Sequence, residues 1–168
     1  METSKKILRL VPVVSILASL LVVSSSTTAA AGACWSPKPE EQQFRSAMNL
    51  ARSANGESQL QLDPELSKAA RLHTREMTAK DLLYHTPDSS LTNRVTHWSV
   101  LGENVGVGGT VDSLHDAFMN SSPHRANILY SQFRYVGIGV REAEGRMWVT
   151  VIFEASSDPG TRLPMPSC

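Results

Sequence analysis

The stretch from residue 136 to residue 153, VGIGVREAEGRMWVTVIF, decides the fold of this chain. Apolar residues alternate with glycine over residues 136–140, and apolar residues return at every second position toward the end of the stretch. A period of two is typical of strands, and the polar link at residues 143–146 predicts an antiparallel hairpin. Trp148 and Ile152 make the second strand apolar on both faces, so we expect a central strand covered by helices on each side.

Helical patterns precede this hairpin. Apolar residues spaced three and four positions apart predict helices at residues 40–54 and 64–80. Shorter helices are expected at residues 111–119 and 122–129, the last of them started by Ser122 and Pro123. The second helix has Asp63 as its N-cap and Pro64 at its first position. The turn-rich residues 81–110 predict a loop with at most a short strand near Glu103. Helices first and strands last favour the α+β class, with a sheet between helical layers.

The first 33 residues have the pattern of a secretory signal peptide. Three basic residues precede an apolar run over residues 10–23, and small residues follow up to Ala33. The run is shorter than the roughly 20 residues that span a bilayer. We therefore expect a secreted, extracellular protein, with association with the cell envelope left open, cut after Ala31 or Ala33 and without a membrane span after processing.

Two cysteines, Cys34 and Cys168, stand near the two ends of the expected mature chain. Outside the cytoplasm we expect a disulfide between them, which would destabilise the unfolded chain by roughly 4–5 kcal/mol in the entropy model. The alternative is lipid attachment at Cys34, which directly follows Ala33. That alternative is weaker because Ala31 stands where a lipoprotein signal usually has leucine, and because Cys168 would stay unpaired.

Length and charge limit the classes of function. The mature chain of roughly 135 residues makes one domain, which we place at residues 40–156, followed by a proline-containing tail at residues 157–168. Without the signal peptide the net charge is about −2, with no polybasic stretch to neutralise phosphates. We therefore expect no nucleic acid partner, and we expect a monomer.

Two of the five histidines, His85 and His124, stand beside chain reversals made by proline, where functional groups concentrate. Glu103 lies in a glycine-rich segment that permits close backbone approach. Two imidazoles and a carboxylate can bind a divalent cation, with Zn²⁺ the best match, or form an acid/base cluster. The chain has no HExxH or CxxC motif, so the residues alone leave both open.

The remaining histidines and two serines have plainer interpretations. We interpret His73 and His115 as hydrogen-bonded core or surface residues, and we assign no role to His97, which lies beside Trp98 with no acidic neighbour. Ser121 and Ser122 precede Pro123, but serine before proline usually starts a helix, where its hydroxyl accepts a backbone N–H bond. The chain also lacks the Gly-x-Ser-x-Gly turn of serine hydrolases.

Six stretches together resemble, in order, the CAP superfamily, also called SCP-like or cysteine-rich secretory, antigen 5 and pathogenesis-related proteins. They are LDPEL at 62–66, HTREM at 73–77, YHT at 84–86, GENVG at 102–106, FMNSSPHRANIL at 118–129 and VGIGV at 136–140. Each stretch alone is weak evidence, but their order makes the resemblance strong over residues 44–154. The likeness is to the short bacterial branch.

The resemblance implies a three-layer α-β-α sandwich with an antiparallel central sheet and a cleft that holds two histidines and two acidic residues. His85 and His124 match the histidines, which take a divalent metal in some members, and Glu103 matches the glutamate of the Gly-Glu-Asn motif. The second acidic position falls near Ser121. Losing that carboxylate removes a candidate general base and a charge that would balance a cation, so we assign no catalytic residue.

The resemblance leaves the function open, because relatives are credited with lipid binding, signalling, antimicrobial action and occasionally proteolysis. Our first hypothesis is an extracellular binding module for a lipid or cell-envelope component, with ligand residues His85, Glu103, Ser121 and His124 and a metal site at the two histidines. The second is a metal-dependent hydrolase acting on peptide or cell-wall substrates. The third is a structural or partner-binding wall protein.

Overall fold

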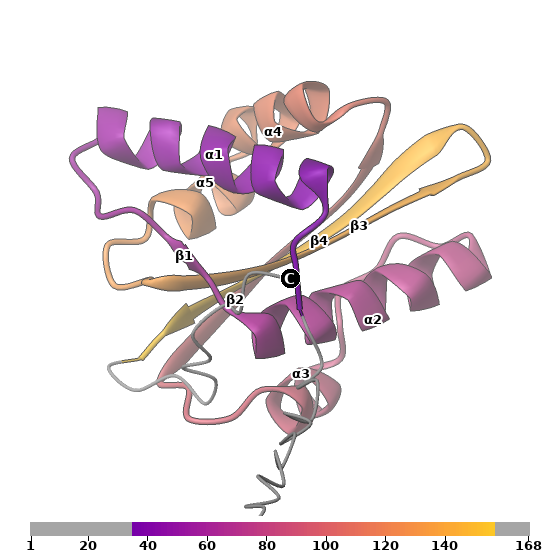
Figure 1. Cartoon of the computed structure of the whole chain (residues 1–168), viewed down its shortest axis with the longest axis horizontal. Coiled ribbons are helices and arrows are strands. Elements are labelled where there is room, and N and C mark those ends of the chain that lie inside the picture. The colour runs from indigo at the N-terminus through magenta and orange to yellow at the C-terminus, as the bar shows by residue number, and fades with distance from the viewer. Residues whose placement is uncertain (1–34, 157–168) are drawn as a thin grey trace, which may run out of the picture. The chain divides into compact units, whose positions relative to one another are not determined.

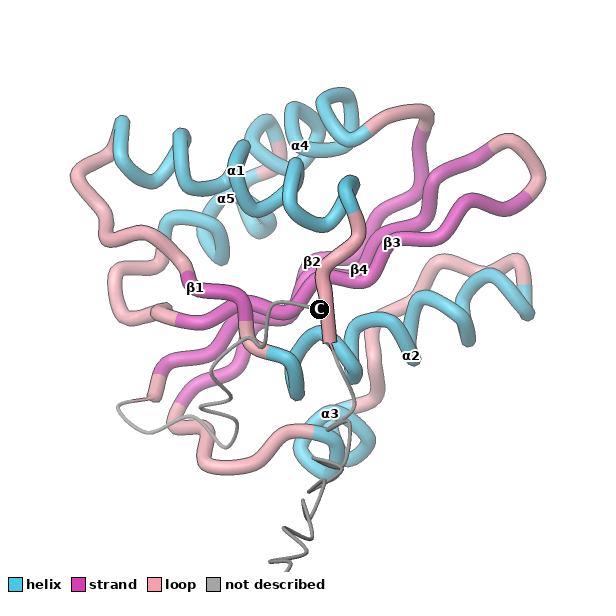
Figure 2. Tube along the Cα trace, viewed as in Figure 1, coloured by secondary structure: helices cyan, strands magenta, loops and turns pink. Residues whose placement is uncertain are grey.

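The computed structural model describes residues 35–156, in which a four-stranded sheet lies between two layers of helices (Figures 1 and 2). One layer holds α1, α4 and α5, and the other holds α2 and α3. The elements are α1 Pro39–Ala54, β1 Gln61–Leu62, α2 Pro64–Lys80, α3 Asp88–Arg94, β2 Val100–Gly108, α4 Val111–Asn120, α5 Ser122–Leu129, β3 Tyr135–Ala143 and β4 Arg146–Ala155. This arrangement confirms the α+β sandwich.

The strands follow the order β1-β3-β4-β2, so β4 is central, as its two apolar faces predict. It pairs antiparallel with β3 and with β2. The two-residue strand β1 pairs parallel with β3 at the sheet edge, placing Gln61 opposite Tyr135. The antiparallel expectation therefore holds for the three long strands, and β1 is too short to leave a periodic pattern in the sequence.

Glycines in β3 allow α2 to lie directly on the sheet. A Cβ atom at Gly137 would come 2.0 Å from the backbone carbon of Leu66, and one at Gly139 would come 2.5 Å from that of Ala70. Both distances are far below van der Waals contact, so only glycine fits beneath this helix. Asp63 caps α2 as predicted, since its side chain accepts a hydrogen bond from the N–H of Leu66.

The prediction of a loop over residues 81–110 is wrong at α3, and the short strand expected near Glu103 is longer than predicted. The chain forms the helix α3 and the nine-residue strand β2, which pairs with β4 along its whole length. Its glycines make room for aromatic rings: a Cβ atom at Gly102 would lie 2.9 Å from the ring of Phe133, and one at Gly106 would lie 3.0 Å from that of Phe118. Local strand propensity takes no account of tertiary packing, and this packing explains the strand.

Several expectations fall outside the described residues: the signal peptide, the Cys34–Cys168 disulfide or lipidated Cys34, and the tail at residues 157–168. Among residues 35–156, no helix is both long and apolar enough to cross a bilayer.

Candidate functional site

Glu103, on β2, holds the end of the loop that follows α2. Its side chain is 6% exposed, and Oε1 accepts hydrogen bonds from His85 Nδ1 at 2.8 Å and from the backbone N–H of Thr86 at 2.9 Å. Oε2 accepts the hydroxyl of Thr86 at 2.5 Å. Both oxygens of this carboxylate are thus committed to the two residues of the loop. The pairing compensates the burial of its charge.

His85 reaches Glu103 because the chain reverses at the end of α2. Asp81 adopts the left-handed conformation with φ 45°, which ends the helix and sends the chain back along the sheet. A carboxylate oxygen accepts only, so the hydrogen on the His85 ring lies on Nδ1. In the neutral ring the lone pair therefore lies on Nε2, on a side chain that is 61% exposed.

His124, on α5, is held beside the same strand through its backbone. Buried Asn104 on β2 donates from Nδ2 to the carbonyl of His124 at 3.0 Å. Asn127 donates to Asn104 Oδ1 at 2.9 Å and to the Glu103 carbonyl at 3.1 Å. The His124 ring packs against Phe118 with centroids 5.0 Å apart. These contacts fix α5 against the strand that carries Glu103.

The electrostatics place the two imidazoles within each other's field. Partial burial lowers the pKa of His124, and His85 lowers it further whenever the His85 ring is protonated. His124 is therefore neutral at neutral pH, with a ring lone pair available to a ligand or cation. We call His85, Glu103 and His124 together the histidine site.

Ser121 ends α4 and precedes α5. Its carbonyl accepts the N–H of Arg125 at 2.8 Å, but its side chain makes no capping hydrogen bond. The helix begins at Ser122, one residue before Pro123. The prediction that a serine hydroxyl caps this helix is wrong, because no side-chain capping bond forms there. Membership of Ser121 in the ligand site stays a prediction.

The described residues do not form a full set of metal ligands. Residues 35–156 contain no group of three or more His, Cys, Asp or Glu side chains placed to hold a metal ion. Glu103 already accepts hydrogen bonds at both of its oxygens, from His85 and Thr86, and its side chain is only 6% exposed.

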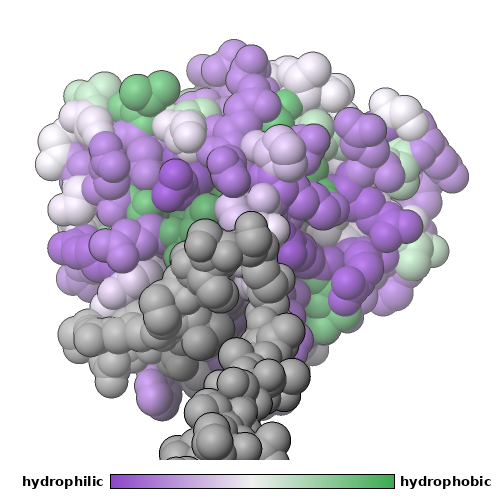
Figure 3. Space-filling model, viewed as in Figure 1, coloured by the Kyte–Doolittle hydropathy of each residue, from purple (hydrophilic) through white to green (hydrophobic). Residues whose placement is uncertain are grey.

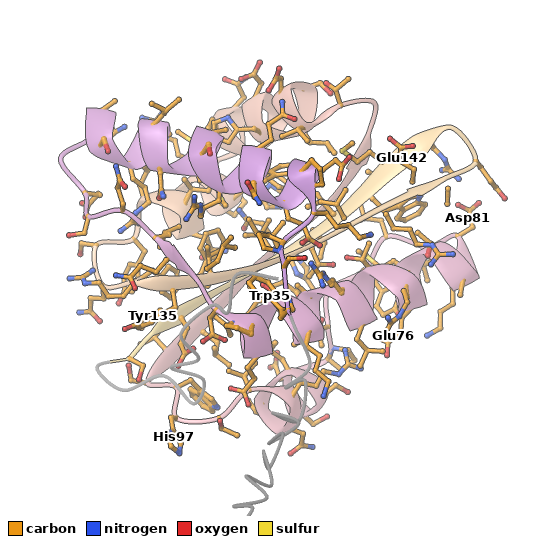
Figure 4. All side chains as sticks on the ribbon, viewed as in Figure 1. Trp35, Glu76, Asp81, His97, Tyr135 and Glu142 are labelled. Atoms are coloured by element: carbon orange, nitrogen blue, oxygen red, sulfur yellow. The ribbon has the colours of Figure 1, made fainter. Side chains whose placement is uncertain are left out.

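The other histidines lie apart from these roles. His73 is fully buried and hydrogen-bonded, as expected of a core residue, and His97 is exposed in the loop before β2 (Figure 4). Burial lowers the pKa of His115, whose Nε2 has no hydrogen-bond partner among the described residues.

Sequence reasoning missed three residues that build the site: Thr86, Asn104 and Asn127. All three stand inside the stretches that carry the family resemblance, each one to three residues from His85, Glu103 or His124. The available signal was their small polar side chains next to the predicted ligands. Their hydrogen-bond partners come from other elements, so only folding identifies them.

Two open hollows lie elsewhere, along α1 and β1, each with a volume of about 470 Å³. Arg45 and Gln61 line both. This face of the molecule is largely hydrophilic (Figure 3). No residue of the histidine site lines either hollow, so they are separate from it.

The chain is similar to several known proteins in sequence or in structure. The Bacillus subtilis protein YkwD is 31% identical over 115 residues, which cover 64% of this chain and 44% of YkwD. An extracellular protein with an SCP domain from Bacillus anthracis superposes with a TM-score of 0.63 at 22% identity, covering 70% of this chain and 40% of that one. An outer surface protein of Borrelia burgdorferi gives a TM-score of 0.66 at 15% identity, covering 73% and 96%.

The chain thus spans less than half the length of YkwD and of the B. anthracis protein. The profile of the CAP family, described as the cysteine-rich secretory protein family, matches residues 45–153, which include every residue of the histidine site. The chain therefore belongs to the CAP family of cysteine-rich secretory proteins.

Proposed function

We propose that the chain is an extracellular binding module that holds a lipid or cell-envelope ligand at the histidine site through a divalent cation. The observation that carries the proposal is the Glu103–His85 hydrogen bond of 2.8 Å, which leaves the exposed Nε2 of His85 as an acceptor near neutral His124. A carboxylate that orients an imidazole in this way also raises its basicity as a metal ligand.

The two imidazoles fit a cation whose remaining coordination positions are filled by the bound lipid or cell-envelope ligand. Neutral imidazoles suit Zn²⁺, which takes four ligands in tetrahedral geometry. With two protein nitrogens, the other positions are open to water and to oxygens of a phosphate or carboxylate group. The cation would then supply the charge that attracts an anionic headgroup or wall polymer.

Export is part of the proposal. The first 33 residues have the composition of a signal peptide. Two structural relatives are described as an extracellular protein and as an outer surface protein. An extracellular ligand is the corresponding expectation for this chain.

Binding is favoured over hydrolysis by the state of Glu103. A general base must be reached by water, whereas the Glu103 side chain is only 6% exposed and its oxygens already accept three hydrogen bonds from His85 and Thr86. Ser121, where the resemblance would place a second acid, offers no carboxylate.

Calorimetric titration of Zn²⁺ at neutral pH tests the cation. We expect one site in the wild-type chain and its loss in His85→Ala and His124→Ala. His97→Asn is the matched control, because it removes an exposed imidazole at a left-handed residue (φ 60°) that asparagine tolerates. Zinc binding that persists in both site variants would refute the cation site.

Co-sedimentation tests the ligand. Wild type and the His85→Ala/His124→Ala double variant are mixed with isolated cell-wall sacculi and with anionic phospholipid vesicles, with Zn²⁺ or with a chelator. The proposal expects zinc-dependent binding to one of the two that the double variant loses. Equal binding by the double variant would instead favour a wall protein without this site.

A further inference from the structure

His73 lies beneath the loop that presents His85. It is on α2, its side chain is fully buried, and its Nε2 is 2.7 Å from the carbonyl oxygen of Tyr84. A carbonyl oxygen only accepts, so the ring donates this bond. Tyr84 directly precedes His85, so this hydrogen bond fixes the peptide group that leads into the functional imidazole.

The other side of the ring is anchored as well. Nδ1 of His73 is 3.3 Å from Glu76 Oε2, and Glu76 also accepts from Arg94 of α3 at 2.7 Å (Glu76 is labelled in Figure 4). The His73 ring thus connects α2, the loop and, through Glu76, α3.

Tyr84 contacts His73 through its own ring too. The two rings meet edge to face, with centroids 4.9 Å apart and an interplanar angle of 84°. Lys80 lies on the Tyr84 ring, with Nζ 4.8 Å from its centroid and 3.0 Å from its hydroxyl. Packing and hydrogen bonding therefore hold the same residue in place.

His85 is consequently placed between two fixed peptide groups. On one side the Tyr84 carbonyl accepts from His73, and on the other the N–H of Thr86 donates to Glu103 at 2.9 Å. We propose that His73 is a positioning residue, which sets the loop so that the His85 ring meets Glu103 with its Nε2 directed outward. The proposal deepens the proposed function, on which its biological purpose rests, but the positioning itself is a property of the ligand-free chain.

Amide hydrogen exchange in the ligand-free, isotope-labelled chain tests this role, with the Thr86 N–H as the reporter of docking on Glu103. His73→Phe keeps a ring against Tyr84 but removes the donor, and His73→Gln restores an N–H donor. The control is Thr74→Val, at the adjacent buried residue, whose hydroxyl bonds to Gly139 and Thr150 in the sheet rather than to the loop.

We expect His73→Phe to raise the exchange rate of the Thr86 amide by about tenfold or more beyond any change in the β4 amides. A change of this size corresponds to the loss of one strong hydrogen bond. His73→Gln should recover part of the protection, whereas Thr74→Val should weaken Thr86 and β4 amides alike. If His73→Phe affects Thr86 and β4 equally, His73 is a core residue without a positioning role.

A second measurement needs no variant, so it stands even if His73→Phe fails to fold. In the wild-type chain, a scalar coupling across the hydrogen bond should connect His73 Nε2 to the Tyr84 carbonyl carbon. Its absence in a spectrum that resolves both nuclei would overturn the proposal. Neither experiment involves zinc or a wall ligand, so a failure here is distinct from a failure of the proposed binding function.

Discussion

At the scale of single residues, ionisation of Glu154 destabilises the folded chain. It lies on β4, is 1% exposed, and its Oε1 has no hydrogen-bond partner among the described residues. Burial, together with the negative charges of Asp63 and Glu65, raises its pKa to about 7. Since the unfolded chain ionises nearer the ordinary value of 4.5, the folded state retains a proton that the unfolded state has released.

The first prediction follows from the sign of this shift. The contribution of Glu154 to the free energy of unfolding is greatest below about pH 4.5. It falls as the pH rises toward 7 and then levels off, with a loss of up to roughly 3 kcal/mol. Glu154→Gln removes the ionisation, so we expect it to exceed wild type in unfolding free energy at pH 8 and to match it near pH 4. Urea unfolding at both values measures this.

The control for this prediction is Glu142→Gln, at an exposed glutamate on neighbouring β3 (labelled in Figure 4). It should leave the pH dependence of stability as in wild type. A Glu154→Gln chain that is less stable than wild type at pH 8 would show that the carboxylate is ionised and paired in the folded protein.

The candidate site could be predicted in part at this scale. His85, Glu103 and His124 were recognisable because imidazoles and a carboxylate in turn-rich sequence serve chemistry more often than packing. Their proximity rests on partners such as Asn104 and His73, and small polar or core-patterned residues carry no sign of their contacts. His73 in particular follows the apolar stripe of α2, where a core histidine and a positioning histidine look the same.

At the scale of elements, the contact between α2 and β3 depends on glycine. A Cβ atom at Gly139 would lie 2.5 Å from the backbone of Ala70 and of Arg71, which cannot move without shifting the helix. We therefore expect Gly139→Ala to destabilise the chain by about 2–3 kcal/mol or more, as overpacking does. Denaturant unfolding measures the loss.

Gly109→Ala is the matched control, because no atom lies within 4 Å of a Cβ atom there and the backbone is not left-handed. Its effect should stay within about 0.5 kcal/mol. Comparable stability of the two variants would mean that α2 is not seated against β3 as closely as described.

The same glycines explain what could be predicted of the elements. The hairpin was predictable because its alternation, including Gly137 and Gly139, fits strands whatever their partners. Strand β2 was predictable only as a short strand near Glu103, because Gly102 and Gly106 lower local strand propensity and are explained only by the rings of Phe133 and Phe118 that cover them. Helix α3 buries only Leu91 among its seven residues, too little to leave a periodic pattern.

At the scale of the whole molecule, the histidine site joins parts that are distant in the chain. His85 follows α2, Glu103 is on β2 and His124 is on α5, so a cation held by both imidazoles would crosslink the loop on one side to a helix of the opposite layer. A ligand that binds only this folded arrangement stabilises it by mass action. Binding at the site should therefore be visible as global stability.

We expect Zn²⁺ at 100 times its dissociation constant to raise the unfolding free energy by about 2.7 kcal/mol at pH 7.5, measured as a rise in the thermal midpoint. His85→Ala and His124→Ala should abolish the rise, and His97→Asn should retain it. Acid should also abolish it, because protonated imidazoles do not bind metal.

The pH profile also separates the two interpretations of the site. If a cation bridges the imidazoles, the zinc-dependent rise in thermal midpoint disappears at acid pH together with calorimetric binding, since both require the same neutral rings. If the rings bind an anionic ligand directly, acid strengthens binding instead, because protonation supplies the positive charge. Anionic vesicles or sacculi that bind more tightly at pH 5 than at pH 7.5, without zinc, would replace the cation by a pair of imidazolium groups at the same residues.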